Sequence, residues 1–199
     1  MMHERVAKAI SELERFIGTV DDALAIPREA GEFVHALILG CGAKHGVEIG
    51  TSYGYSGLWI ASALRENGGT LITIDHDPRK SETARDYFDS GGLTACVDVR
   101  TGRAADVLES LTGPIDFVLN DADKESCIRY VELVAEKLSD RAVVLTDNTI
   151  DLADRLAEFV AWIRQRDDFY STTVPVGNGM ELSIKQTVRQ KREPVPRYS

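Results

Sequence analysis

The stretch 44–57, KHGVEIGTSYGYSG, decides the fold of this chain. It predicts a short buried strand over 46–49, a turn that contains three glycines, and then the start of a helix. A strand that turns directly into a helix exposes backbone N–H groups at the helix N-terminus, which form a polar site for a ligand. The strand carries Glu48, and a buried carboxylate is costly unless it is paired. We therefore expect the sheet to be built outward from this strand.

Length and composition indicate one soluble globular domain. The chain has 199 residues, of which 43% are hydrophobic and 28% charged, as is ordinary for a globular protein. We expect one domain over residues 1–186 and a flexible basic tail over residues 187–199. The first 40 residues predict helices over 4–17 and from Pro27 to Gly40, which either cover the ligand site or form a dimer interface.

Charge and apolar patterning exclude several classes of partner. The formal net charge is -9, which disfavours nonspecific binding to nucleic acid and to anionic membrane surfaces. The first residues are charged and contain no apolar signal segment, and no apolar run approaches the ~20 residues of a membrane span. The three cysteines lack CxxC spacing. A cytoplasmic protein is the expectation.

Strands and helices alternate along the rest of the chain. Continuous apolar runs that end in a polar residue predict parallel strands buried on both faces, and they lie at 47–50, 71–75, 117–121 and 143–147, with a further strand at 95–100. Helical patterns lie between and after them, at 55–64, 79–88, 104–111, 125–138 and 152–166. Residues 169–185 predict a final hairpin around Gly177-Asn178-Gly179. The pattern predicts a doubly wound, mostly parallel sheet that finishes with an antiparallel pair.

The polar residues at the strand ends predict the ligand site. In an open parallel sheet ligands bind beyond the carboxyl ends of the strands, so Gly50, Asp75, Asp121 and Asp147 should face one crevice. An acid in the position of Asp75 is suited to bind the two hydroxyls of a ribose. The alternative is a helix cap, but Asp77 before a proline is the better candidate for that role.

The glycine pattern disfavours a dinucleotide. The three glycines of the turn do not match GxGxxG, and the distance from Gly50 to Asp75 exceeds the ~20 residues of the dinucleotide fingerprint. A nucleoside ligand without a pyrophosphate fits the pattern better than NAD.

A second group of residues has the oxygen ligands that Mg²⁺ prefers. It comprises Asp121 and Asp123 in DADK, and Asp147 and Asn148 in TDN. Lys124 lies three residues after Asp121, within reach of the same crevice, where a lysine can act as a general base. Each motif alone could be a surface turn that caps a helix. Both, however, follow apolar strands, and this favours a shared functional site.

These residues resemble the cation-dependent class I O-methyltransferases of the caffeoyl-CoA and catechol type. The matching pieces occur in family order from about residue 31 to 185: VEIGTSYGYSG, TIDHDP, GRAADVL, FVLNDADK, VVLTDN and GNGMELSIK. DADK followed at this distance by DN is the specific part of the match. The resemblance implies a Rossmann-like, seven-stranded methyltransferase sheet with an antiparallel last strand, and a homodimer.

The resemblance also assigns roles by position. The residues expected to contact S-adenosylmethionine are Glu48, Gly50, Thr51, Ser56, Asp75, Ala104 and Asp123. The expected metal ligands are Asp121, Asp147 and Asn148, for Mg²⁺ or alternatively Ca²⁺ or Mn²⁺. Lys124 matches the proposed base of the family. The implied reaction is methyl transfer to a hydroxyl of a small, catechol-like acceptor, in which Asp121 and Lys124 take part directly.

The sequence departs from the family pattern after Asn148. The family usually has a tryptophan and a long loop there, whereas this chain passes through residues 149–152 directly into a helix. Because that loop shapes the acceptor site, the identity of the acceptor does not follow from the resemblance. Two alternatives remain open: a methyltransferase with an atypical acceptor, and a cofactor-binding protein without turnover. Asn120 also stands where aspartate is common, outside the expected ligands.

Overall fold

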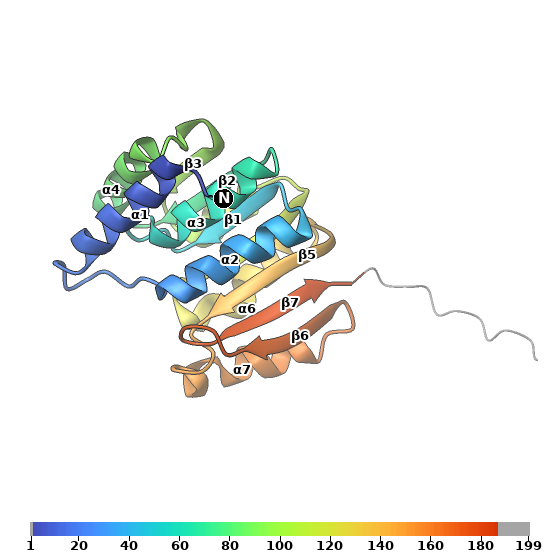
Figure 1. Cartoon of the computed structure of the whole chain (residues 1–199). Coiled ribbons are helices and arrows are strands. Elements are labelled where there is room, and N and C mark those ends of the chain that lie inside the picture. Colours follow the sequence, from blue (N-terminus) through green and yellow to red (C-terminus); the bar gives the residue numbers. More distant parts are fainter. Residues whose placement is uncertain (1, 187–199) are drawn as a thin grey trace, which may run out of the picture.

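A computed structural model describes residues 2–186, and within them the chain forms one seven-stranded sheet with the order β3-β2-β1-β4-β5-β7-β6 (Figure 1). The first five strands in the chain run parallel, and β7 is antiparallel to both β5 and β6. The strands are β1 (His45–Ile49), β2 (Thr70–Asp75), β3 (Val97–Thr101), β4 (Ile115–Asn120), β5 (Leu138–Asp147), β6 (Phe169–Val174) and β7 (Met180–Lys185). The predicted mostly parallel sheet with an antiparallel last strand is confirmed.

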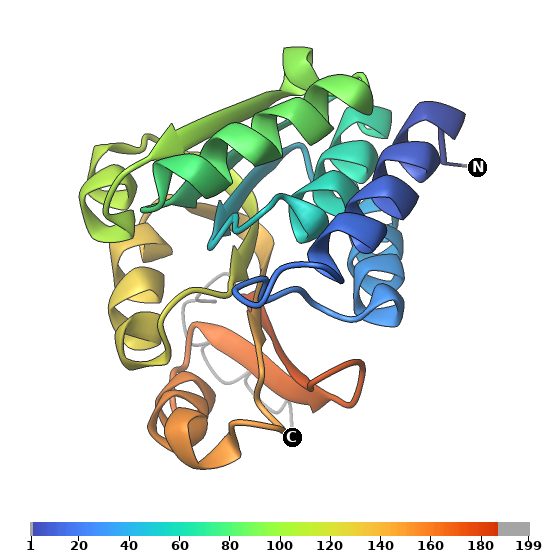
Figure 2. The same ribbon diagram turned by 90° about the vertical axis from the view of Figure 1, so that its left-hand side faces the viewer.

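Helices cover both faces of the sheet (Figure 2). One face packs against α1 (Glu4–Ile17), α2 (Arg28–Cys41), α3 (Tyr55–Glu66) and α4 (Pro78–Ser90). The other packs against α5 (Ala104–Ser110), α6 (Cys127–Ala135) and α7 (Ala153–Arg164). This double cover explains why the strand sequences are continuous apolar runs rather than alternating ones. No helix among residues 2–186 is long and apolar enough to cross a membrane.

The predicted helix over 125–138 is wrong at both ends. Lys124–Ser126 is a 3-10 turn, α6 covers only Cys127–Ala135, and Leu138 already belongs to β5. The cause is tertiary, because the carbonyl of Lys137 accepts a hydrogen bond from the backbone N–H of Ile115 at 2.8 Å. The chain must therefore leave the helix before this residue to extend the sheet. The predicted tail, 187–199, lies outside the described residues.

The edge of the sheet opposite the carboxyl ends is held together by Asp116. One carboxylate oxygen, Oδ2, accepts hydrogen bonds from the backbone N–H groups of Lys44 at 3.0 Å and His45 at 2.9 Å. The other, Oδ1, accepts from the hydroxyl of Ser139 at 2.7 Å. Three neighbouring strands, β1, β4 and β5, are therefore joined through one side chain, which fixes their register at the start.

We predict that Asp116→Ala lowers the free energy of unfolding by about 1–3 kcal/mol, because two backbone N–H groups lose their acceptor. Urea denaturation of both proteins at pH 7 measures the difference. Asp98→Ala is the control, since Asp98 is an exposed edge residue whose side chain pairs with Arg100. Equal losses in the two variants would contradict this role for Asp116.

Candidate active site

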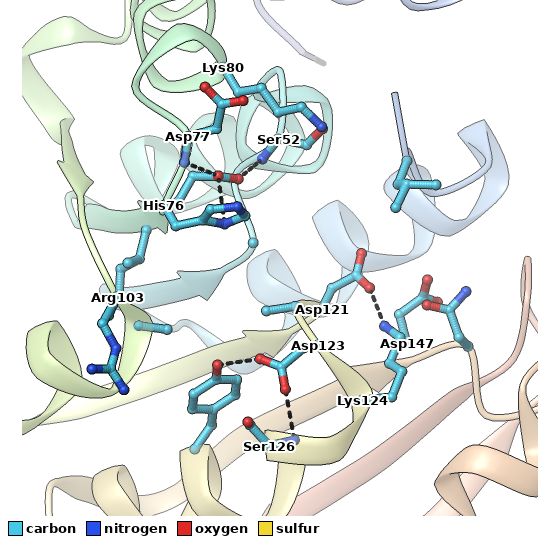
Figure 3. A pocket seen from close by; sticks show the side chains of 18 of the residues that line it. Ser52, His76, Asp77, Lys80, Arg103, Asp121, Asp123, Lys124, Ser126 and Asp147 are labelled. Atoms are coloured by element: carbon cyan, nitrogen blue, oxygen red, sulfur yellow. Dashed lines mark hydrogen bonds and ion pairs between the residues drawn. The ribbon is translucent and has the colours of Figure 1, made fainter. Parts of the chain in front are cut away.

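A pocket of about 990 Å³ lies at the carboxyl ends of β1, β2, β4 and β5 (Figure 3). Its walls include all four predicted strand-end residues, Gly50, Asp75, Asp121 and Asp147. They come together because parallel strands end at the same edge of the sheet. The expected crevice is therefore present, and Ala104, Asp123, Lys124 and Asn148 line it as well.

Gly50 allows β1 and β4 to approach each other at the floor of the pocket. The backbone N–H of Asp121 donates to the carbonyl of Ile49 at 2.9 Å. Gly50 has φ +104°, and a Cβ there would collide with the carbonyl oxygen of Asp121. Only glycine tolerates both the conformation and the close contact, so this residue determines where the side chain of Asp121 starts.

Asp75 is held rigidly by backbone donors. Its Oδ2 accepts from the N–H of Ser52 at 2.7 Å, and its Oδ1 accepts from the N–H of Asp77 at 2.9 Å. Ser52 adopts φ +45° to present this N–H group. Asp77 caps α4 through the N–H of Arg79, as predicted, so Asp75 is not used as the cap. Its carboxylate stands at the pocket wall in a fixed orientation, and this suits recognition of a ligand diol.

Glu48, Thr51 and Ser56 do not line the large pocket. Glu48 is fully buried beneath the glycine turn, where its Oε2 accepts from the hydroxyl of Thr73 at 2.6 Å. The hydroxyl of Thr51 lies 2.5 Å from that of Thr73 and continues the chain of hydrogen bonds. Thr51 and Ser56 instead line a second, small cavity of about 10 Å³ under the loop between α1 and α2.

Burial raises the pKa of Glu48 from 4.5 to about 7, with hydrogen bonds from Ser56 and Thr73 opposing the shift. The second oxygen, Oε1, has no hydrogen-bond partner among residues 2–186. A carboxyl group whose folded-state pKa lies above its unfolded value holds its proton better in the folded protein. Its contribution to stability is therefore greatest below the unfolded pKa and declines as the pH rises toward 7.

We predict that Glu48→Gln removes much of this pH dependence. The shift from 4.5 to about 7 corresponds to about 3 kcal/mol of stability lost by the wild type between pH 4.5 and pH 7 or above. The free energy of unfolding by urea is measured at pH 4.5, 6 and 8. As the pH rises, the free energy of unfolding of the variant should increase relative to that of the wild type. A constant difference across this range would contradict the assignment.

Asp121 and Lys124 form an ion pair inside the pocket. The Lys124 ammonium lies 2.8 Å from Asp121 Oδ1, and the two side chains are 8% and 16% exposed. The pair arises locally, because the turn that follows β4 places the lysine three residues after the aspartate. Burial raises the pKa of Asp121 above its ordinary value, while the charge of Lys124 opposes the shift.

Asp147, the last residue of the neighbouring strand β5, is buried, and only the backbone N–H of Asn148 and the charge of Lys124 favour its charged form. It is 2% exposed, and its Oδ1 has no hydrogen-bond partner within the described part of the chain. Burial, and then the nearby charge of Asp121, raise the pKa of Asp147 to about 7. Two neighbouring, largely buried carboxylates repel each other when both are charged, and a cation bound between them would relieve this repulsion.

Asn148 completes the oxygen-rich wall. It adopts the left-handed conformation, with φ +69°, and lines the pocket directly after Asp147. Its side-chain N–H group donates to Asp151 at 3.3 Å, which leaves its amide oxygen available. Within residues 2–186, no group of three or more His, Cys, Asp or Glu side chains is arranged to hold a metal. A site here would therefore depend on the two carboxylates and this amide oxygen.

Asp123 has a structural role in addition to its place at the pocket wall. Its Oδ1 accepts from the N–H of Ser126 at 3.0 Å, which caps the 3-10 turn, and its Oδ2 accepts from the hydroxyl of Tyr130 at 2.5 Å. The alternative interpretation of DADK as a cap thus holds for this residue. Tyr130 is buried and lines the pocket, and the sequence analysis did not single it out. The sequence signal that could have identified Tyr130 is an aromatic residue about one turn into the helix that follows DADK.

The loop between α1 and α2 also contributes to the pocket. Asp22, Leu24 and Ala25 of this loop line it, and so does Lys80 of α4. Nothing in the local sequence of the loop predicts this contact, which depends on how α1 and α2 pack against α3.

A family model described as O-methyltransferase matches residues 5–186. The chain belongs to the O-methyltransferase family. This confirms the resemblance found in the sequence.

Relatives and solved structures agree with this membership. A catechol O-methyltransferase from Niastella koreensis is 36% identical over 132 residues, which cover 64% of this chain and 59% of that protein. A catechol O-methyltransferase from Mycobacterium tuberculosis is 33% identical over 136 residues, 68% of this chain and 61% of that protein. The chain thus matches about three fifths of the length of these curated relatives. The O-methyltransferase TomG from Streptomyces achromogenes, solved in complex with SAM, superposes with a TM-score of 0.80 at 27% identity, covering 94% of this chain and 92% of that one.

Proposed function

We propose that this protein is an S-adenosylmethionine-dependent O-methyltransferase that uses a divalent cation and a small hydroxylated acceptor. The observation that carries the proposal is that one pocket contains both Asp75, whose carboxylate is fixed by two backbone N–H groups, and the buried group of Asp121, Lys124 and Asp147. The family match and the SAM-bound neighbour support the choice of methyl donor.

The donor would lie between β1 and β2. In this arrangement Asp75 binds the ribose hydroxyls, and Ala104, the first residue of α5, lies beside the adenine ring. When bound, S-adenosylmethionine supplies an electrophilic methyl group. The residues of the chain contribute orientation, because a reaction between two bound molecules is accelerated mainly by holding the reacting atoms in line.

The cation would be held by Asp121, Asp147 and Asn148. The observation that supports this fit is the buried, unpartnered Oδ1 of Asp147 beside a second buried carboxylate. A bound divalent ion lowers the pKa of a coordinated hydroxyl and so makes it a better nucleophile. Mg²⁺ suits a donor set of two carboxylates and one amide oxygen, and Mn²⁺ and Ca²⁺ accept the same atoms.

Lys124 would receive the proton of the acceptor hydroxyl. Its side chain is almost fully buried and points into the pocket, where Asp121 holds it 2.8 Å away (Figure 3). A lysine fixed at this place needs no large movement to reach a hydroxyl that lies beside Asp121 and Asp147.

The acceptor would be a small molecule with a hydroxyl group, and the curated catechol O-methyltransferase relatives support a catechol-like compound. The loop over 148–152 is short and is tied to the β6–β7 hairpin through the backbone N–H of Thr149 and the carbonyl of Gly179 at 3.0 Å. Leu152, at the end of this loop, and Arg155 of α7 line the pocket here and would face the acceptor. A screen of catechols, hydroxycinnamoyl thioesters and flavonoids for methyl transfer tests this part of the proposal.

We predict that Lys124→Met lowers kcat by a factor of about 10²–10⁴ and leaves the Kd for S-adenosylmethionine within about twofold of the wild type, because a general base acts on the chemical step. Calorimetry and initial rates provide the two values. Lys124→Arg is the matched variant: it retains the positive charge beside Asp121 but cannot accept a proton near neutral pH. High activity in the arginine variant would exclude Lys124 as the base.

We predict that Mg²⁺ stabilises the wild type and that Asp147→Asn abolishes this effect. An ion that binds only the folded state at a hundredfold excess over its Kd should raise Tm by about 5 °C or more. Differential scanning calorimetry with Mg²⁺ and with EDTA measures the rise, and methyl transfer should be lost in EDTA and return with Mg²⁺. Asp98→Asn is the control: it removes the same charge on the edge strand β3, away from the pocket, and should keep the rise. Full activity in EDTA would remove the cation from the proposal.

A further inference from the structure

Residues 18–27 connect α1 to α2, as Figure 2 shows, and we call this segment the strap. Asp22, Leu24 and Ala25 of the strap line the large pocket. The strap is anchored at its far end, where Ile26 is buried in the core and Pro27 lies against the β6–β7 turn. A Cβ on Gly177 of that turn would meet Pro27 Cδ at 3.2 Å. Between its ends the strap presents Leu24, which is 83% exposed although it lines the pocket.

Two side chains fasten the middle of the strap to the methyl-donor side of the pocket. The hydroxyl of Tyr53 donates to Asp22 Oδ1 at 2.8 Å, and the ammonium of Lys80 donates to the backbone carbonyl of Asp22 at 2.7 Å. The Lys80 nitrogen also lies 5.2 Å from the centre of the Tyr53 ring. Lys80 is 17% exposed, so these contacts confine a largely buried side chain. We call this group, Asp22, Tyr53 and Lys80, the clasp.

The strap separates the residues expected to hold the donor. Gly50, Asp75, Ala104 and Asp123 line the large pocket, whereas Thr51 and Ser56 line the small cavity. Leu24, Ala25 and Ser52 belong to the walls of both. The small cavity, at about 10 Å³, has room for about one water molecule. One donor molecule can reach both sets of residues only if the strap moves away from Thr51 and Ser56.

We propose that Lys80 and Tyr53 are positioning residues of the methyl-donor site, which act through Asp22 to hold the strap closed and so limit the rate at which the donor enters and the spent donor leaves. The inference rests on the proposed function, since it takes S-adenosylmethionine as the ligand. Asp22 and Lys80 line the large pocket, and Tyr53 lines the small cavity. The hydrogen bonds of the clasp are to Asp22 and not to Asp75, Asp121 or Lys124, so loosening them leaves those three residues in place. The clasp therefore affects exchange of the ligand rather than the chemical step.

The test compares Tyr53→Phe and Lys80→Met with the wild type. Stopped-flow dissociation of S-adenosylmethionine and S-adenosylhomocysteine should be about three- to tenfold faster in both variants, as expected for the loss of one hydrogen bond. Hydrogen exchange of the strap amides in the ligand-free protein should be faster in both variants. The factor by which kcat falls should be smaller than the factor by which the affinity for S-adenosylmethionine falls. Tm should stay within about 2 °C of the wild type.

Lys185→Met is the matched control. Lys185 is also 17% exposed, pairs with a carboxylate at 2.8 Å and lies 5.2 Å from an aromatic ring, but it stands on β7 away from the pocket. It should leave dissociation and strap exchange unchanged. Binding by the wild type with unchanged dissociation in both clasp variants would overturn this inference alone. Failure of the wild type to bind either compound would overturn the proposed function, and the inference with it.

Discussion

The close approach of β1 and β4 at Gly50 is the constraint on which the rest of the site depends. The backbone of Asp121 bonds to Ile49, and a side chain at position 50 would occupy the space of the Asp121 carbonyl. Because β4 also pairs in parallel with β5, the same register carries Asp147 to the edge of the pocket beside Asp121. The carboxylates are brought together by the backbone of the sheet, against their own repulsion. Burial, and then the nearby charge of Asp121, therefore raise the pKa of Asp147 to about 7.

Much of the fold could be predicted because the strands are buried on both faces. A continuous apolar run such as the one at 117–119 favours a strand that is covered on both faces, and the polar residues that follow it mark where the strand ends. The prediction failed at residues 136–142, where β5 begins with Leu138-Ser139 and continues through Arg141, which has φ +63°. This part of β5 is polar and irregular, and it becomes a strand only because Ile115 offers it a partner. Such a partner is a tertiary feature and leaves no local pattern.

The residues of the site likewise fall into those that the sequence could place and those that it could not. Residues at strand ends, such as Asp75 and Asp147, could be placed because topology alone brings them to one edge. The strap and its clasp could not, since the contact between Asp22 and Lys80 spans 58 positions in sequence and depends on helix packing. The double role of Asp123, as cap and as pocket wall, also needed coordinates, because the sequence presents these roles as alternatives. Thr51 and Ser56 lie behind the strap and Glu48 is buried beneath the glycine turn, so the assignment of these three residues to the donor stays a prediction.

The two buried carboxylates affect both the stability of the protein and its affinity for a cation. The buried carboxylates cost free energy in the ligand-free protein, and a cation would return it on binding. The most direct measurement is a titration of the purified protein with Mn²⁺, followed by electron paramagnetic resonance of the free ion. We expect one Mn²⁺ to be bound per chain by the wild type and none by Asp147→Asn over the same range. Equal binding by the two proteins, or no binding by either, would contradict the account.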